Sequence, residues 1–243
     1  MNVPIRLVSA HQANYLPYTG FFEKVLAADH FILVDDTQFV KRGSFGWIHR
    51  NRILGANGPM WLTLPVKTHQ RYSQNIGEVE LDGDAWRRKH WRSLEHSYRN
   101  APFFSEVAPF FKETYSREWT HLLPLSRHLI QGTLDLLGVT TPLAMSSELG
   151  LQGHGSDYVL ELARKTGASH YLSGMHGRDY LNVGDFAEAG IGLVFQEFRC
   201  PEYPQGKEGA SFIPNLSIVD ALFSVGPRGT RELLERGREA VRP

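Results

Sequence analysis

Residues 5–36, IRLVSAHQANYLPYTGFFEKVLAADHFILVDD, decide the fold of this chain. Two short apolar runs within them, residues 5–9 and 31–34, are bounded by polar residues and predict buried strands. Between these runs, the apolar residues of 21–26 fall on one helical face. A strand, a polar loop, a helix and a second strand in so short a stretch form a βαβ unit. This unit predicts parallel strands joined by a right-handed crossover.

The rest of the chain returns to this alternation after a long helical stretch. Residues 84–137 carry leucines at helical spacing, and Gly138 predicts the end of the last helix there. We therefore expect one α/β domain over residues 1–243, with a mostly parallel, Rossmann-like sheet and a helical insert at about 84–138. We expect an irregular polar stretch over 38–58 and strands over 60–66, 171–172 and 191–195. We expect helices over 159–166, 186–189 and 216–223, the first of them capped by Ser156 or Asp157, and a solvated helix after Arg228.

Composition narrows the classes of function. Lys plus Arg and Asp plus Glu number 26 each, so no global charge attracts nucleic acid or a membrane surface, and we expect neither as a partner. Arg6 interrupts the apolar start of the chain, which resembles neither a signal peptide nor a membrane span. The one cysteine, Cys200, cannot form an internal disulfide or a multi-cysteine zinc site, and it has no adjacent base that would favour a nucleophile. We expect a cytoplasmic protein that acts on a small molecule.

Polar loops follow three predicted strands at one edge of the sheet, which is the edge where open parallel sheets bind ligands. The first loop, residues 11–17, contains an imidazole, two amides and a phenol, so His11 is a candidate general base. The alternative is a structural role for His11, with the two amides capping the helix. The candidate substrate-binding residues of this loop are Gln12, Asn14 and Tyr15.

The second loop begins with Asp35 and Asp36, which are candidate catalytic carboxylates. Because successive strand residues point to opposite faces, we expect one to enter the site and the other to orient an arginine or cap a helix. No cluster with zinc spacing accompanies them, and no metal site is predicted, although one carboxylate and a substrate phosphate suffice for magnesium. A solvated acidic turn is the alternative. Gln38, which follows, is a candidate binding residue.

The third loop, residues 173–180, has the composition of an anion-binding loop. Its two glycines let the backbone approach a ligand, and Arg178 offers a rigid fork of donors to carboxylate or phosphate. The glycine spacing matches neither a Walker A motif nor a dinucleotide fingerprint. The alternative is a surface turn in which Arg178 pairs with Asp179. The candidate binding residues are Ser173, Gly174, His176, Arg178 and Tyr180, together with a second clamp, or solvated basic turn, at Arg50, Asn51 and Arg52.

Several motifs in order resemble the WbqC-like protein family. They are HQANYLP (11–17), GFF (20–22), DHFILVDD (29–36) with Gln38, RNRI (50–53), WLTLPV (61–66), YLSG (171–174), GRDYL (177–181), and the segments 201–204 and 214–217. The likeness runs from Ile5 to about Gly226. Ala13 stands where the family pattern has proline, and Cys200 stands where histidine often precedes the proline. The resemblance implies a place in bacterial O-antigen or other specialised biosynthesis, with glycine or aminoacyl transfer in some members, and it implies no proven catalytic residue.

Three functions fit these residues, and we favour an enzyme. The first is an acyl or aminoacyl transferase that forms an amide on an amino sugar or another specialised metabolite, with His11 or Asp35 as base and Arg178 on a phosphate. Its donor would be an activated thioester, and its substrate would be free or linked to a carrier protein or a nucleotide. The second is an ATP- and magnesium-dependent nucleotidyltransferase or ligase of the HIGH-motif type, although Asn14 stands where that motif has its second histidine. The third is a non-catalytic sugar-nucleotide-binding protein. The sequence does not determine the oligomeric state.

Overall fold

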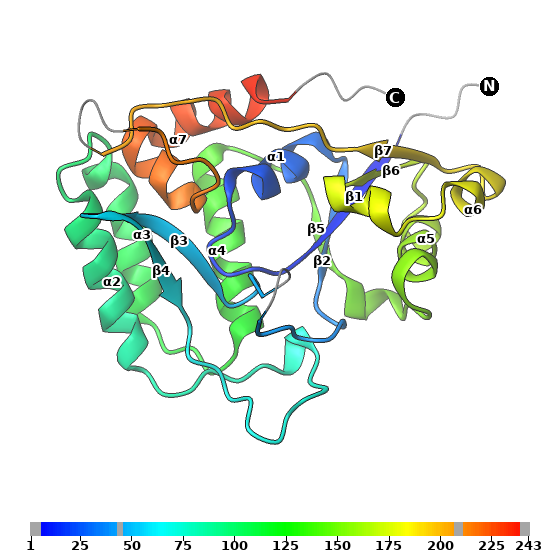
Figure 1. Ribbon diagram of the computed structural model, residues 1–243, viewed down its shortest axis with the longest axis horizontal. Helices are drawn as coiled ribbons and strands as arrows, with labels where there is room; N and C mark the ends of the chain where they lie inside the picture. The colour runs from blue at the N-terminus through cyan, green and yellow to red at the C-terminus, as the bar shows by residue number, and fades with distance from the viewer. Residues whose placement is uncertain (1–5, 43–45, 207–210, 239–243) are drawn as a thin grey trace.

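The structure, a computed structural model, describes residues 6–42, 46–206 and 211–238. A parallel five-stranded sheet in the order β5-β2-β1-β6-β7 lies at its centre (Figure 1). Counted along the chain, this is the 3-2-1-4-5 order of Rossmann-like folds, so the predicted fold class is confirmed. The strands are β1 (Leu7–Gln12), β2 (His30–Val34), β5 (Leu143–Met145), β6 (His170–Ser173) and β7 (Gly192–Phe195).

Helices cover both faces of the sheet (Figure 1). Phe31 and Leu33 point into the larger core, which β2 shares with α1, α4 and α7, whereas Ile32 and Val34 point into the smaller core under α5 and α6. This alternation along one strand is why the strands read as continuous apolar runs. The helices are α1 (Thr19–Ala27), α2 (Ala85–Tyr98), α3 (Phe104–Ser116), α4 (Leu122–Leu137), α5 (Gly155–Lys165), α6 (Val183–Glu188) and α7 (Ile218–Arg236), and the 3-10 turns are η1 (Ile76–Glu78), η2 (Ser146–Leu149) and η3 (Met175–Asp179).

A β-hairpin occupies part of the stretch expected to be irregular. Strands β3 (Arg50–Gly55) and β4 (Gly58–Thr63) pair antiparallel as a separate two-stranded sheet, so the expectation for 38–58 is wrong over residues 50–55. Asn51 and Ile53 are buried, whereas Arg50 and Arg52, on the other face of the strand, are half-buried, and their charge hides the strand pattern. The signal that could have revealed it is the Asn57-Gly58 pair, in which Asn57 ends the two-residue turn and Gly58 begins β4 at φ 109°.

The C-terminal region also differs from expectation. The helix that follows Ser217 does not become a solvated tail, because Thr230, Leu233 and Leu234 are buried. A kink at Gly226, where φ is 76° and ψ is 172°, turns the second half of α7 back onto the core. Between β7 and α7 the chain crosses beside α1 as a long strap (Figure 1), and Gln196 donates a 2.7 Å hydrogen bond from the strap to the carbonyl of Gly20.

Helix α4 ends where the sequence predicted, whereas the start of helix α5 differs from the prediction. Gly138 ends α4 in the left-handed conformation at φ 63°, as predicted. Helix α5 begins at Gly155 with His154 as its N-cap, so the predicted cap at Ser156 or Asp157 is two or three residues too late. No helix within the described ranges has an apolar stretch of the length that a bilayer crossing requires.

Candidate functional site

Three predicted loops leave the same edge of the sheet. His11 is in register with Leu33 on β2, and Ser9 is in register with Leu172 on β6, so the loops after β2, β1 and β6 emerge side by side. The chain runs outward in opposite directions from the β1–β6 boundary. In open α/β sheets this boundary is the switch point where ligands bind. His11, Asp35 and the loop 173–180 therefore share one edge.

His11 is held as a neutral imidazole with one nitrogen available. Its ring packs edge-on against Phe21, with ring centroids 5.2 Å apart, and Nδ1 lies 3.0 Å from the carbonyl oxygen of Gln12. A carbonyl can only accept, so Nδ1 carries the proton and Nε2 carries the lone pair. Burial, followed by the charge of Lys24, lowers the pKa of His11 to about 3. The residue as a whole is half-buried.

Lys24 is a second member of this site that sequence reasoning missed. It extends from α1 beneath the sheet edge and donates a 2.9 Å hydrogen bond to the carbonyl of Ala10, and it is only 4% exposed. Its Nζ lies 4.0 Å from where a side chain at Gly174 would begin, so it faces the end of β6. Burial lowers the pKa of Lys24 to about 8, against the opposing charge of Glu23. The available signal was a charged pair inside a short helix that lies between two buried strands.

Asp35 has a positioning role. Its two carboxylate oxygens accept hydrogen bonds from the Ser147 amide (3.0 Å) and the Ser147 hydroxyl (2.8 Å), and the Ser146 hydroxyl lies 3.0 Å away. The same hydroxyl lies 2.6 Å from Asp36, and its one proton can serve only one carboxylate at a time. Asp36 also accepts from Tyr158 at 2.5 Å, through the same oxygen. The second oxygen of Asp36 has no hydrogen-bond partner among the described residues, whereas Asp35 ties the end of β2 to η2, which follows β5.

The other predicted residues of the first loop are Tyr15, Asn14 and Gln12, and each has different surroundings. Tyr15 is fully buried and bonds to His90 (2.8 Å) and Tyr115 (2.5 Å), so it belongs to the core and does not face the sheet edge. Asn14 is buried, and its side-chain oxygen has no partner among the described residues. Gln12 lies on the other face of β1, with its amide 3.4 Å from the hydroxyl of Thr37.

The predicted second clamp lies on the hairpin beside the first loop. Asn51 is buried and donates to the carbonyl of Leu16 at 2.6 Å, so it anchors β3. Arg50 stacks over Trp61, with 4.6 Å between the guanidinium and the ring centroid, and Arg52 lies 5.6 Å over Trp47. Arg50 also donates from Nε to the carbonyl of Gly46 at 2.8 Å, so stacking and this hydrogen bond together hold its guanidinium in place. Gln38 is exposed and donates to the backbone of Tyr72.

The third loop is mostly exposed, and its Arg178 contacts residues at and just after the end of β7. Arg178 pairs with Glu197 at 3.1 Å and lies 4.5 Å over the ring of Phe195, so the expected alternative partner, Asp179, is wrong. Asp179 instead lies 3.5 Å from His176. Of the remaining predicted residues, Ser173 is buried, Gly174 faces Lys24, and Tyr180 is half exposed.

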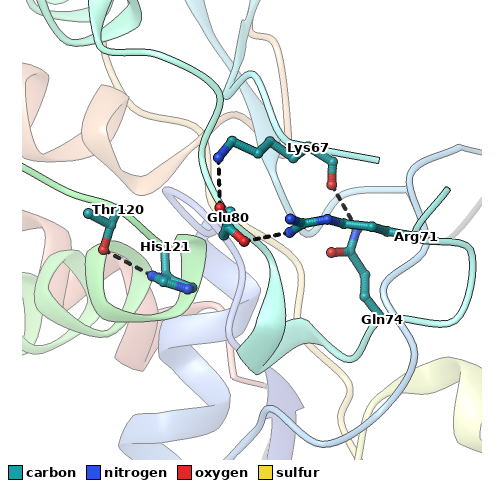
Figure 2. Close-up of polar contacts among 6 residues, drawn as sticks. All are labelled: Lys67, Arg71, Gln74, Glu80, Thr120 and His121. Atoms are coloured by element: carbon teal, nitrogen blue, oxygen red, sulfur yellow. Dashed lines mark hydrogen bonds and ion pairs between the residues drawn. The ribbon is translucent and has the colours of Figure 1, made fainter. Parts of the chain in front are cut away.

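A further loop, residues 66–81, borders this edge. Its Gly77 amide donates to the carbonyl of Asp35 at 2.8 Å, so it packs against the end of β2. Figure 2 shows that Glu80 lies between Lys67 and Arg71, at 2.7 and 2.6 Å. Hydrogen bonds from both cations lower the pKa of Glu80 to about 2. This pairing holds the two sides of the loop together.

Two surface depressions lie elsewhere. They measure about 640 and 550 Å³, flank α2, and include none of the predicted site residues. Within the described residues, no three His, Cys, Asp or Glu side chains gather as metal ligands. The sheet edge itself holds His11 and Lys24, whose pKa values are lowered, together with the half-buried Asp36 and the exposed Arg178.

The fold and this edge define a Rossmann-like α/β protein with a polar switch-point site. The chain belongs to the WbqC-like protein family, whose pattern matches residues 12–232. It is 35% identical over 224 residues to the uncharacterized protein Rv1507c of Mycobacterium tuberculosis, an alignment that covers 91% of this chain and 95% of that protein. No solved structure matches it significantly.

Proposed function

We propose that this protein is an acyl or aminoacyl transferase that forms an amide on an amino sugar or a related specialised metabolite. The observation that supports it most directly is the neutral imidazole of His11, with Nε2 free, beside the buried amine of Lys24 at the switch point. Amide formation from a thioester needs a group that takes a proton from the attacking nitrogen and returns one to the leaving sulfur. A neutral imidazole can do both.

In the proposed step, the acceptor amine attacks the thioester carbonyl. The C–N bond forms, the C–S bond breaks, His11 Nε2 takes one proton from the nitrogen, and the departing thiolate receives that proton. Lys24 acts on His11 as a positioning residue, because its positive charge is one cause of the low pKa of the imidazole. When Lys24 loses its proton, that cause disappears and His11 becomes a stronger base.

The neighbouring groups have matching roles in this proposal. Arg178 would hold a phosphate of the acceptor or donor, since a guanidinium binds phosphate with two donors. The free oxygen of Asp36 would accept a hydrogen bond from a hydroxyl or ammonium group. Asp35 would act through Ser146 and Ser147, by holding η2 in place.

The test is an assay of thiol release and amide formation, by mass spectrometry, with aminoacyl and acyl thioesters and nucleotide-linked amino sugars. We expect His11→Ala to lower kcat by about 10²–10⁴-fold, the usual contribution of a general base. His154→Ala, which changes an exposed histidine at the start of α5, is the matched control and should leave kcat unchanged. Normal turnover by a folded His11→Ala variant would remove the proposed role of this residue.

The pH dependence of kcat distinguishes the proposed action of Lys24 on His11 from a purely structural role. We expect the kcat profile of the wild type to have an alkaline limb, a rise in kcat above the lowered pKa of Lys24 of about 8, and Lys24→Met should lack this limb because the amine that titrates there is gone. A variant with lower kcat and an unmoved limb would show that Lys24 only supports the fold.

The strand order favours one second candidate, an ATP-dependent nucleotidyltransferase or ligase, because Rossmann-like sheets bind nucleotides at this switch point. Release of pyrophosphate from ATP in the presence of a carboxylate or phosphate acceptor would identify it. Thiol release without ATP would exclude it in favour of acyl transfer.

A further inference from the structure

Helix α2 exposes positive charge that the described structure does not neutralise. Its sequence, AWRRKHWRSLEHSY, has four Arg or Lys residues and one acid, Glu95. Arg87 pairs with Asp84 at 3.2 Å. Arg88, Lys89 and Arg92 are exposed, and no carboxylate of the described residues lies within ion-pair distance of them.

This arrangement works against the helix itself. The first turn of α2 has no acid, and cations near a helix N-terminus oppose the helix dipole. Arg88 and Arg92 are one turn apart, where like charges repel each other. Arg88, Lys89 and Arg92 have no ion pair among the described residues, and a negatively charged partner would supply one.

Basic side chains form a ladder along one side of the helix. Arg88, Arg92 and His96 follow each other at intervals of four residues, and Arg99 comes three residues later. Residues at these intervals share one face, with a rise of ~6 Å for each step of four. A second helix with carboxylates one turn apart has the same repeat.

A groove runs along this ladder. It is the depression of about 640 Å³ between α2 and the turn of the β3–β4 hairpin, residues 55–60. Arg88, Arg92 and His96 line one wall, while Pro59 and Met60 supply an apolar opposite wall. The groove thus combines a row of cations with an apolar strip, which is the complement of an amphipathic helix with one acidic face.

We propose that this groove docks an acidic amphipathic helix of a partner protein. Charge complementarity places the partner's carboxylates on Arg88 and Arg92, and its apolar face on Met60. Single-stranded nucleic acid fits less well, because it uses exposed aromatic rings for stacking and the groove has none among its lining residues. The further statement that the partner is a carrier protein that delivers the acyl donor rests on the proposed function.

The test uses a helix-stabilised peptide with Glu at positions i, i+4 and i+8 and Leu on the adjacent face. Its control is a peptide of the same composition with the Glu residues distributed around the helix. Binding is measured by fluorescence anisotropy at several salt concentrations. The protein variants are Arg88→Glu/Arg92→Glu and, as a matched control of equal charge change, Arg164→Glu/Arg228→Glu on other exposed helix faces.

We expect the spaced peptide to bind the wild type and the control variant equally, and to bind Arg88→Glu/Arg92→Glu at least tenfold more weakly. A Lys-for-Glu version of the peptide should recover binding to Arg88→Glu/Arg92→Glu, which shows that the contact is direct. Equal binding to all variants, equal binding of the scrambled peptide, or no binding to the wild type would overturn the proposal. Tighter, Arg88-dependent binding of a single-stranded RNA oligonucleotide would also overturn it.

A turnover assay with a free thioester distinguishes the docking proposal from the proposed acyl transfer. Arg88→Glu/Arg92→Glu should turn over a free small thioester at the wild-type rate, since the groove is separate from the sheet edge. Loss of peptide binding with that activity intact supports docking alone. A protein that binds the peptide but transfers no acyl group from any donor retains the docking site and loses the proposed function.

Discussion

Tyr98 of the helical insert donates a 2.8 Å hydrogen bond to the carboxylate of Asp220, the third residue of the last helix, and both residues are buried. Tyr203 donates to the other oxygen of the same carboxylate at 2.8 Å, and Gln205 does so at 2.9 Å. One buried acid thus joins the insert, the strap and α7. Burial raises the pKa of Asp220, and the three donors partly oppose this increase.

We predict that Tyr98→Phe destabilises the protein by about 1–3 kcal/mol, because it removes a donor from a buried charge and leaves the amide of Leu54 without its 3.0 Å acceptor. The pKa of Asp220 should increase further. Urea unfolding measures the first effect, and Tyr72→Phe, at an exposed phenol, should stay within about 0.5 kcal/mol. Equal stabilities of the two variants would show that the network contributes little.

We predict that Lys24 makes stability depend on alkaline pH. Its folded pKa is lowered to about 8 from 10.5, so between these values the unfolded chain holds a proton that the folded chain has lost. Stability should therefore rise over that window by about 3 kcal/mol, at 1.36 kcal/mol for each unit. Thermal unfolding of Lys24→Met should lack this rise, whereas Lys112→Met, at an exposed lysine of α3, should retain it. Parallel pH profiles for wild type and Lys24→Met would contradict the assignment.

We predict that Gly226→Ala is among the more damaging small substitutions, at about 2–4 kcal/mol. The residue has φ 76° and ψ 172°, and an added Cβ would lie 2.5 Å from the ring of Phe103. Gly155→Ala also places alanine at positive φ, at 55°, but meets no atom within 4 Å, so it should cost about 1 kcal/mol. The difference between the two, from chemical denaturation, measures the added cost of the Phe103 contact and of the backbone conformation at Gly226.

We predict that Glu197 competes with anions for Arg178. The ion pair is more than half exposed, so Glu197→Gln should leave stability nearly unchanged. The same change should tighten the binding of pyrophosphate several-fold, and Arg178→Gln should abolish the gain, both measured by calorimetry. Glu232→Gln, which breaks the exposed pair with Arg228 on α7, is the control and should change nothing. If Glu197→Gln binds pyrophosphate no better than the wild type, Arg178 is not an anion site.

The sequence was sufficient to predict the central parallel sheet because its strands are buried on both faces. Runs such as Phe31–Val34 are apolar without alternation, and their polar ends identify the carboxyl edge. It was insufficient for β3, where half-buried arginines interrupt the apolar pattern, and for β5, which has only three residues. The second half of α7 was read as solvated because its buried face is narrow and its charges are many.

The candidate site was likewise predicted only in part from the sequence. Parallel strands end at one edge, so the sequence determined that His11, Asp35 and the loop of Arg178 lie near each other. It could not determine which of them is free, because the partners come from distant parts of the chain. Asp35 is engaged by Ser146 and Ser147, which are more than 100 residues away.

The apolar runs and polar strand ends of this sequence, by themselves, determine a Rossmann-like sheet and the edge that carries its chemistry. Only the tertiary structure decides that Lys24 lies against His11, that Asp35 is a structural clamp, and that the cations of α2 face a groove beside the hairpin. The physical reason is that secondary structure follows local periodicity, whereas pKa values, hydrogen-bond partners and surface charge depend on groups that only folding brings together.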